Sequence, residues 1–142
     1  MTEALYTAHA QVTGGRNGHG RTSDGRLDLD LRQPKGLGGD GEGVNPEQLF
    51  AIGYAACFGT TLDVLGRRAE LTADDAEIDA AVSLAPAEGG RLRLGVELRI
   101  SLPSLTDEQA TELAGAAHQA CPYSRATRDN IDVRLVVNGT PL

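Results

Sequence analysis

The sequence predicts an α+β fold with antiparallel sheets, a long buried central helix and a second helix. Several segments alternate apolar and polar residues, which is the period of a half-buried strand. Two other segments carry helix start signals. The resulting order is strands, helix, hairpin, helix and strand, which favours helices packed on antiparallel sheets. A chain of 142 residues is expected to form a single domain, residues 1–142, around one core.

The N-terminal third is predicted to contain two strands separated by glycine-rich loops. Residues 4–13 are rich in Thr, Val and Tyr and predict the first strand, and residues 14–20 predict a loop. In residues 27–32 three leucines alternate with charged residues, which indicates a half-buried strand. Glycine recurs through residues 34–44, which are expected to form another loop.

The longest helix is predicted to begin at Asn45. Asparagine is a good N-cap, and Pro46 suits the first helical position. Glu47 is then expected at the positive end of the helix dipole. Residues 49–58 are apolar on every side, so the helix is expected to be buried all round. This apolar run is shorter than the ~20 residues that cross a bilayer, so no membrane span is expected.

A hairpin and a second helix follow. Residues 78–84 and 92–100 both alternate and flank a turn, which predicts a β-hairpin with one apolar face. A capping box, Thr106 to Gln109, opens the second helix, and Cys121 falls on its apolar face. Pro122 is expected to end that helix. Residues 131–137 then predict the final strand.

Composition limits the possible partners and cofactors. The net charge is −7 with a single lysine, which argues against a nucleic acid partner. The first residues lack the basic and apolar segments of a secretory signal, so a cytoplasmic location is expected. His9, His19 and His118 are far apart and there is no Cys-x-x-Cys, so no metal site is expected. The glycine-rich stretches do not match a dinucleotide fingerprint, and no bound cofactor is expected.

The two cysteines, Cys57 and Cys121, are the strongest functional signal. Four of the five aromatic residues lie close to one of them in the sequence. Two inert core thiols would explain this pattern, because free cysteine is among the most buried residue types. A redox site would need a thiolate, a cation that stabilises it and a second thiol. Cys57 lies too far from Pro46 for the helix dipole to activate it. Arg16, between glycines, is either that cation or a solvated loop residue.

Four segments resemble the organic hydroperoxide resistance (Ohr) proteins, a branch of the OsmC-like superfamily. They are Thr13-Gly-Gly-Arg16, Asn45-Pro-Glu-Gln-Leu-Phe50, Gly53-Tyr-Ala-Ala-Cys-Phe58 and residues 121–131, which begin Cys-Pro-Tyr-Ser. The resemblance covers essentially the whole chain. It implies an OsmC-like fold and an intertwined homodimer. It also implies that the protein reduces organic hydroperoxides, including fatty-acid hydroperoxides. The external dithiol reductant that it implies is a lipoyl group carried by a lipoylated protein.

The resemblance also implies roles for individual residues. Cys57 is similar to the peroxidatic cysteine and Cys121 to the resolving one. Arg16 matches the arginine that stabilises the thiolate, and Glu47 matches the carboxylate that pairs with it. An arginine supplies a permanent charge, and a carboxylate can fix its planar head through paired hydrogen bonds.

A stripe of three aromatic residues on the predicted helix is a candidate substrate pocket. Phe50, Tyr54 and Phe58 recur every four residues. They are expected either to line a pocket for an alkyl tail or to be ordinary core residues.

Helix geometry places Glu47 about 15 Å from Cys57 along the axis, since ten residues separate them. We therefore expect the Arg16–Glu47 pair of each site to come from the partner subunit. Two alternatives to an Ohr peroxidase remain: an OsmC-type peroxidase with broader substrates, and a redox-sensing or binding protein whose thiols do not turn over.

Overall fold

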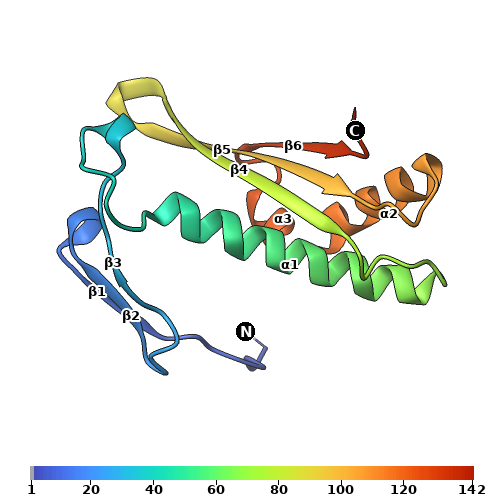
Figure 1. Ribbon diagram of the computed structural model, residues 1–142, viewed down its shortest axis with the longest axis horizontal. Coiled ribbons are helices and arrows are strands. Elements are labelled where there is room, and N and C mark those ends of the chain that lie inside the picture. Colours follow the sequence, from blue (N-terminus) through green and yellow to red (C-terminus); the bar gives the residue numbers. More distant parts are fainter. Residues whose placement is uncertain (1) are drawn as a thin grey trace. The chain divides into compact units, whose positions relative to one another are not determined.

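The computed structural model describes residues 2–142 and forms two compact units, one ending at Leu49 and one running from Phe50 to Leu142. The elements in chain order are β1 (Ala10–Thr13), η1 (Gly15–Asn17), β2 (His19–Thr22), β3 (Asp28–Asp30), η2 (Lys35–Leu37), α1 (Pro46–Arg68), β4 (Glu77–Pro86), η3 (Glu88–Gly90), β5 (Leu92–Ser101), α2 (Asp107–Ala120), α3 (Pro122–Thr127), β6 (Asp132–Val137) and β7 (Thr140–Pro141) (Figure 1). The predicted α+β class is confirmed.

The N-terminal unit is a three-stranded antiparallel sheet in the order β1-β2-β3. Its first strand is shorter than predicted and begins at Ala10, because the partner strand β2 ends opposite that residue, at Thr22. The predicted loop at residues 14–20 was too long, since β2 already starts at His19. Residues 34–44 form the expected loop, which is closed by a bridge between Leu31 and Val44.

The second unit contains a four-stranded sheet in the order β4-β5-β6-β7. The predicted hairpin is confirmed: β4 and β5 pair from Glu77↔Ser101 to Pro86↔Leu92. The pairing of β5 with β6 is parallel, which differs from the expectation of antiparallel sheets. The cause is the connection between them, which consists of two helices and carries the chain back to the starting end of β5. The short strand β7 was not predicted.

The start of α1 follows the prediction. The Asn45 side chain accepts a hydrogen bond from the Gln48 backbone N–H at 2.9 Å, and the Gln48 side chain accepts one from the Asn45 N–H at 3.0 Å. Together they form a reciprocal cap, with Pro46 at the first helical position. This cap fixes the turn on which Glu47 lies.

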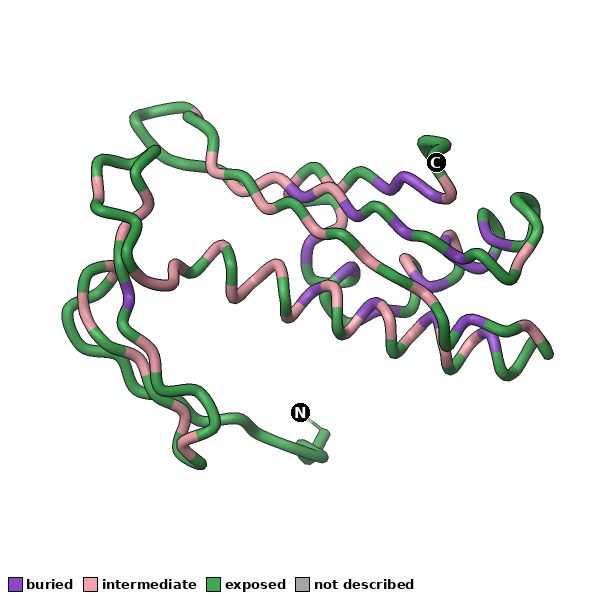
Figure 2. The backbone as a smooth tube through the Cα atoms, viewed as in Figure 1, coloured by how far each residue is buried: buried purple, intermediate pink, exposed green. Residues whose placement is uncertain are grey.

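The prediction that α1 is buried all round was wrong. Only one stripe is buried, formed by Tyr54, Phe58, Leu62 and Gly66. On another side Ile52 is 70% exposed. One sheet can cover only one stripe of a helix, so the rest of α1 is half-buried or exposed in this chain (Figure 2).

The expectation that no segment is long and apolar enough to span a bilayer was also wrong. The helix α1 has 23 residues and contains an 18-residue window with a mean hydropathy of 1.5, so it meets both conditions by length and composition. Its buried stripe lies on the sheet, however, as in the core helix of a globular domain. Asp63, Arg67 and Arg68 also place charge on its second half.

The second helix has the predicted capping box, in which Thr106 and Gln109 bond reciprocally. Pro122 does end α2, but it also begins α3, which was not predicted, because proline is tolerated in the first turn of a helix. The three helices lie on the same side of the four-stranded sheet (Figure 1). The core between them includes Leu98, Ile100 and Leu102 from the region of β5, and Leu113 and Cys121.

Truncation of Leu98, which is fully buried, should destabilise the protein strongly. We expect Leu98→Ala to lower the free energy of unfolding by about 2–5 kcal/mol, because it removes buried methyl groups and leaves a cavity. Leu92→Ala on the same strand is the matched control, since Leu92 is 58% exposed. Denaturant unfolding of both variants checks this, and equal losses would contradict the described core.

Candidate active site

Arg16 lies in η1, within the tight turn between β1 and β2. Gly14 has φ +75°, and a Cβ on Gly18 would lie 1.7 Å from the Thr13 carbonyl oxygen, so the turn closes only with glycine there. The turn is also tied down from outside, because the Asn17 side chain accepts a hydrogen bond from the Gln33 N–H at 3.1 Å. These contacts hold the backbone from which the Arg16 side chain projects.

The Arg16 guanidinium and the Glu47 carboxylate form a bidentate pair. Nη1 donates to Oε2 at 2.9 Å and Nη2 donates to Oε1 at 2.7 Å. The hydrogen bonds from Arg16 lower the pKa of Glu47, and the hydrogen bond to Glu47 raises the pKa of Arg16. Both groups therefore remain ionised at neutral pH, and the planar guanidinium is held in one orientation.

Cys57 and Cys121 lie side by side. The two sulfur atoms are 3.8 Å apart, although 64 positions separate the residues in the sequence. Both are free thiols; Cys121 is fully buried and Cys57 is half-buried. A disulfide needs a sulfur–sulfur distance of about 2.05 Å, so this geometry is a reduced pair close to bonding distance. Cys57 is the more accessible of the two.

The surroundings of Cys57 oppose its ionisation. Burial raises the pKa of the Cys57 thiol, and its hydrogen bond with Cys121 raises it further. The backbone N–H of Tyr123 donates to the Cys57 sulfur and lowers the pKa, but by less than burial raises it. A reactive thiolate at this position therefore requires a positive charge beyond these groups.

Aromatic rings gather beside the cysteines in an arrangement that differs from the predicted stripe. Phe50, Tyr54 and Tyr123 form a cluster with ring centroids 5.6–6.0 Å apart. Tyr123 approaches α1 at Gly53, where a Cβ would lie 3.1 Å from the tyrosine hydroxyl. Tyr123 is 38% exposed and Phe50 is half-buried, so both offer surface to a ligand.

Two of the three predicted pocket residues have no such surface. Tyr54 and Phe58 are fully buried in the core, as members of the stripe that packs on the sheet. Of the predicted set, only Phe50 is placed where a substrate tail could touch it. Tyr123 was not included in that set, although its position two residues after Cys121 was the available signal.

A buried polar network beside Cys121 was also missed. Tyr54, His118, Ser124 and Thr127 are joined by hydrogen bonds of 2.7–3.3 Å. The sequence contains no local signal for it, since Tyr54 is 70 residues from Ser124 and 73 from Thr127. Among residues 2–142, no group of three or more His, Cys, Asp or Glu side chains is arranged to hold a metal ion.

The predicted site residues thus form two pairs. Arg16 and Glu47 pair within the N-terminal unit, and Cys57 and Cys121 pair within the second unit. Glu47 and Cys57 share α1, where ten residues correspond to about 15 Å along the axis.

Comparisons with known proteins identify the family of this chain. Residues 39–136 match the family model described as OsmC-like protein. An organic hydroperoxide resistance protein of Xanthomonas axonopodis pv. citri is 46% identical over 137 residues, which cover 95% of this chain and 96% of that protein. The chain belongs to the Ohr branch of the OsmC-like family.

Solved structures of Ohr proteins share the fold. The crystal structure of Bacillus subtilis OhrB has a TM-score of 0.87 at 45% identity, covering 95% of this chain and all of that one. The structure of an organic hydroperoxide resistance protein from Elizabethkingia anophelis has a TM-score of 0.90 at 44% identity and covers 96% of this chain and 98% of that one. This membership supports a role in organic hydroperoxide resistance and, in general terms, a peroxidase-type redox role.

The Arg16–Glu47 pair should give the Ohr chain an acid-sensitive contribution to stability. Because the pKa of Glu47 is lowered in the folded chain, the pair stabilises the fold above the ordinary glutamate pKa. This contribution is lost as the pH falls through the lowered value. We expect Glu47→Gln to be less stable than wild type at pH 7 and equally stable at about pH 2. Denaturant unfolding at both pH values measures this; a pH-independent difference would contradict the ion pair.

Proposed function

We propose that this chain is a cysteine-based peroxidase that reduces organic hydroperoxides to alcohols. The observation that carries the proposal is the Cys57–Cys121 pair, with sulfur atoms 3.8 Å apart and only Cys57 accessible. A half-exposed thiol next to a buried one is the arrangement of an attacking and a resolving cysteine. Attack by the exposed sulfur places its oxidised product within reach of the second thiol.

The proposed reaction has three steps. The Cys57 thiolate attacks the terminal oxygen of the hydroperoxide, so that the O–O bond breaks, an alcohol leaves after gaining a proton, and Cys57 becomes a sulfenic acid. The Cys121 thiol then attacks the Cys57 sulfur, forming the disulfide and releasing water. An external dithiol of the lipoyl type reduces the disulfide by thiol–disulfide exchange and returns both thiols.

In this mechanism Arg16 stabilises the thiolate and Glu47 orients Arg16. The paired hydrogen bonds to Glu47 support this assignment because they hold the guanidinium plane in one direction. Arginine donates through five N–H groups, and the pair uses two of them, so further donors remain for a sulfur or peroxide oxygen. The apolar part of the substrate would lie against Phe50 and Tyr123.

The active protein is proposed to be a homodimer in which each site takes Arg16 and Glu47 from the partner chain. The separation of about 15 Å between Glu47 and Cys57 along α1 supports this. Uncovered apolar side chains support it as well. Val12 is 55% exposed, Leu27 46%, Ile52 70% and Val64 41%, and a second copy would cover such surface. The proposed location is the cytoplasm.

Two other functions compete with this proposal. An OsmC-type peroxidase with broader substrates would reduce hydrogen peroxide as fast as an organic hydroperoxide. A redox-sensing protein would lose its thiols once and would not be recycled by any dithiol. Parallel assays with cumene hydroperoxide and hydrogen peroxide, with dihydrolipoamide as the reductant, separate the three.

Substitution of each cysteine should block a different step. Cys57→Ser should reduce peroxide turnover by at least about 1,000-fold, because it removes the nucleophile. Cys121→Ser should react once and then accumulate sulfinic and sulfonic acid on Cys57. Intact mass spectrometry after one and ten equivalents of cumene hydroperoxide measures both, and normal turnover by Cys57→Ser would refute the mechanism.

Mixing two inactive variants tests the shared site. Arg16→Ala should be inactive in the oxidation step, and Cys57→Ser inactive altogether. Mixed dimers of the two should regain about a quarter of wild-type activity, because half of the dimers are mixed and each restores one of its two sites. Sites built within one chain would restore none, so inactivity of the re-associated mixture would refute the partner assignment.

A further inference from the structure

Buried hydrogen bonds join the three helices next to Cys121. The Tyr54 hydroxyl of α1 lies 2.7 Å from Ser124 Oγ of α3 and 3.3 Å from Thr127 Oγ1. His118 Nδ1, in the last turn of α2, is 2.9 Å from the same Ser124 Oγ. Tyr54 and Ser124 are fully buried. We call Tyr54, His118, Ser124 and Thr127 the helix clamp.

The helix clamp closes across the joint that carries Cys121. The Cys121 N–H donates to the Ala117 carbonyl at 2.8 Å, and its carbonyl accepts from the Arg125 N–H at 2.9 Å. Cys121 therefore ends α2 and begins α3, with ψ 127° breaking the helical path. His118 precedes the joint by three residues and Ser124 follows it by three, so their bond fixes the bend between the two helices.

His118 is suited to accept a hydrogen bond in this position. Burial lowers the pKa of His118, and the nearby charge of Arg128 lowers it further, which keeps the ring neutral. A neutral ring protonated on Nε2 accepts at Nδ1 from the Ser124 hydroxyl, and Ser124 Oγ then accepts from the Tyr54 hydroxyl. With the hydrogen bonds running from Tyr54 to Ser124 and from Ser124 to His118, each of the two fully buried hydroxyl groups donates to an acceptor.

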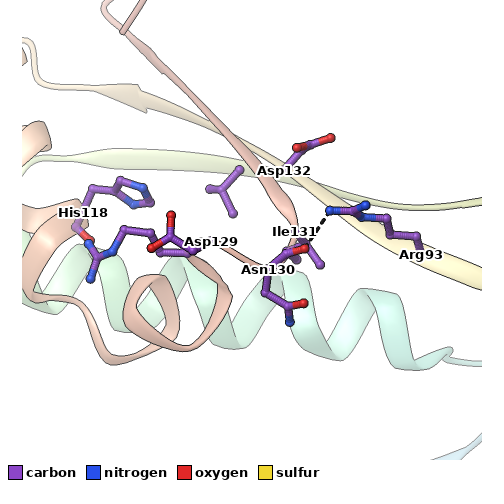
Figure 3. Close-up of a pocket in the computed structure, with 8 residues that line it drawn as sticks. Arg93, His118, Asp129, Asn130, Ile131 and Asp132 are labelled. Atoms are coloured by element: carbon purple, nitrogen blue, oxygen red, sulfur yellow. Dashed lines mark hydrogen bonds between the residues drawn. The ribbon is translucent and has the colours of Figure 1, made fainter.

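The outer side of His118 borders a cavity of about 340 Å³, with Arg93 at the other end (Figure 3). The ring of His118 is half-buried, and its bond to Ser124 orients it. The Arg128 Nη1 donates to the His118 carbonyl at 3.1 Å and holds the backbone of the same turn.

We propose that His118 is a positioning residue for Cys121. Through Ser124 and Tyr54 it holds the joint so that the Cys121 sulfur stays 3.8 Å from that of Cys57. Tyr54 lies one helical turn before Cys57, so the clamp ties Cys121 to the helix that carries its partner. The role in turnover rests on the proposed peroxidase function, but closure of the disulfide can be measured without peroxide.

The test uses the aromatic disulfide 5,5′-dithiobis(2-nitrobenzoic acid) on the reduced full-length protein. The half-buried Cys57, as its thiolate, attacks the reagent and forms a mixed disulfide. One thionitrobenzoate leaves in this step, at a rate proportional to reagent concentration. Cys121 then attacks the Cys57 sulfur, and the second thionitrobenzoate leaves at a rate independent of reagent. Stopped-flow absorbance separates the two phases.

His118→Leu should slow the second phase by about fivefold to tenfold, the effect of one lost buried hydrogen bond, and leave the first phase within about twofold. His118→Asn should restore the second phase, because the asparagine oxygen is an acceptor close to the position of Nδ1. Ser124→Ala removes the other end of the bond and should slow the second phase to a similar extent. If His118→Leu does not fold, the test is made with Ser124→Ala.

The matched control is His9→Leu, which makes the same substitution at an exposed histidine of the N-terminal unit and should change neither phase. The proposal is overturned if the second phase of His118→Leu or Ser124→Ala equals that of wild type. It is also overturned if His118→Asn is as slow as His118→Leu. If the wild-type protein keeps both thiols in the presence of cumene hydroperoxide, the proposed peroxidase function is refuted. The rate of the second phase of thionitrobenzoate release would still decide the role of the helix clamp.

Discussion

One buried stripe of α1, packed on the four-stranded sheet, determines where the reactive groups lie. Tyr54, Phe58 and Leu62 are spaced by four residues and have no exposed surface. Cys57 lies beside this stripe and not within it, so its thiol is at the boundary of the core. Cys121 belongs to the apolar face of α2, which packs into the same core. The two sulfur atoms meet because both helices bury their apolar faces against one sheet.

This placement has an electrostatic consequence for the Cys57 thiol. Burial at the edge of an apolar core raises the pKa of this thiol and so disfavours its ionised form. In the proposed mechanism the Arg16 guanidinium, which is oriented by two hydrogen bonds to Glu47, offsets this cost. Glu47 neutralises part of that charge, so we propose that its contribution is orientation and that the remaining guanidinium donors bind the thiolate.

The features that the sequence predicted well are those decided locally. The caps at Asn45 and Thr106 depend on residues three positions apart, and the hairpin depends on alternation within ten residues. The placement of Cys121 on the apolar face of α2 follows from helix periodicity alone.

The features that were missed depend on distant partners. The parallel pairing of β5 with β6 and the contact between Tyr54 and Ser124 join segments with no common local pattern. Periodicity also shows which residues of α1 are apolar but not which of them a neighbour covers, so burial all round was wrongly predicted. The Ohr resemblance named Arg16 and Glu47, whose pairing no spacing rule would have predicted.

Closing the gap between the two sulfur atoms, from 3.8 Å to about 2.05 Å, constrains which parts of the site move in the proposed reaction. Cys57 lies inside α1, where the backbone is fixed, and the Cys121 joint is held by buried hydrogen bonds. The change therefore falls mainly on the side-chain torsions of the two cysteines.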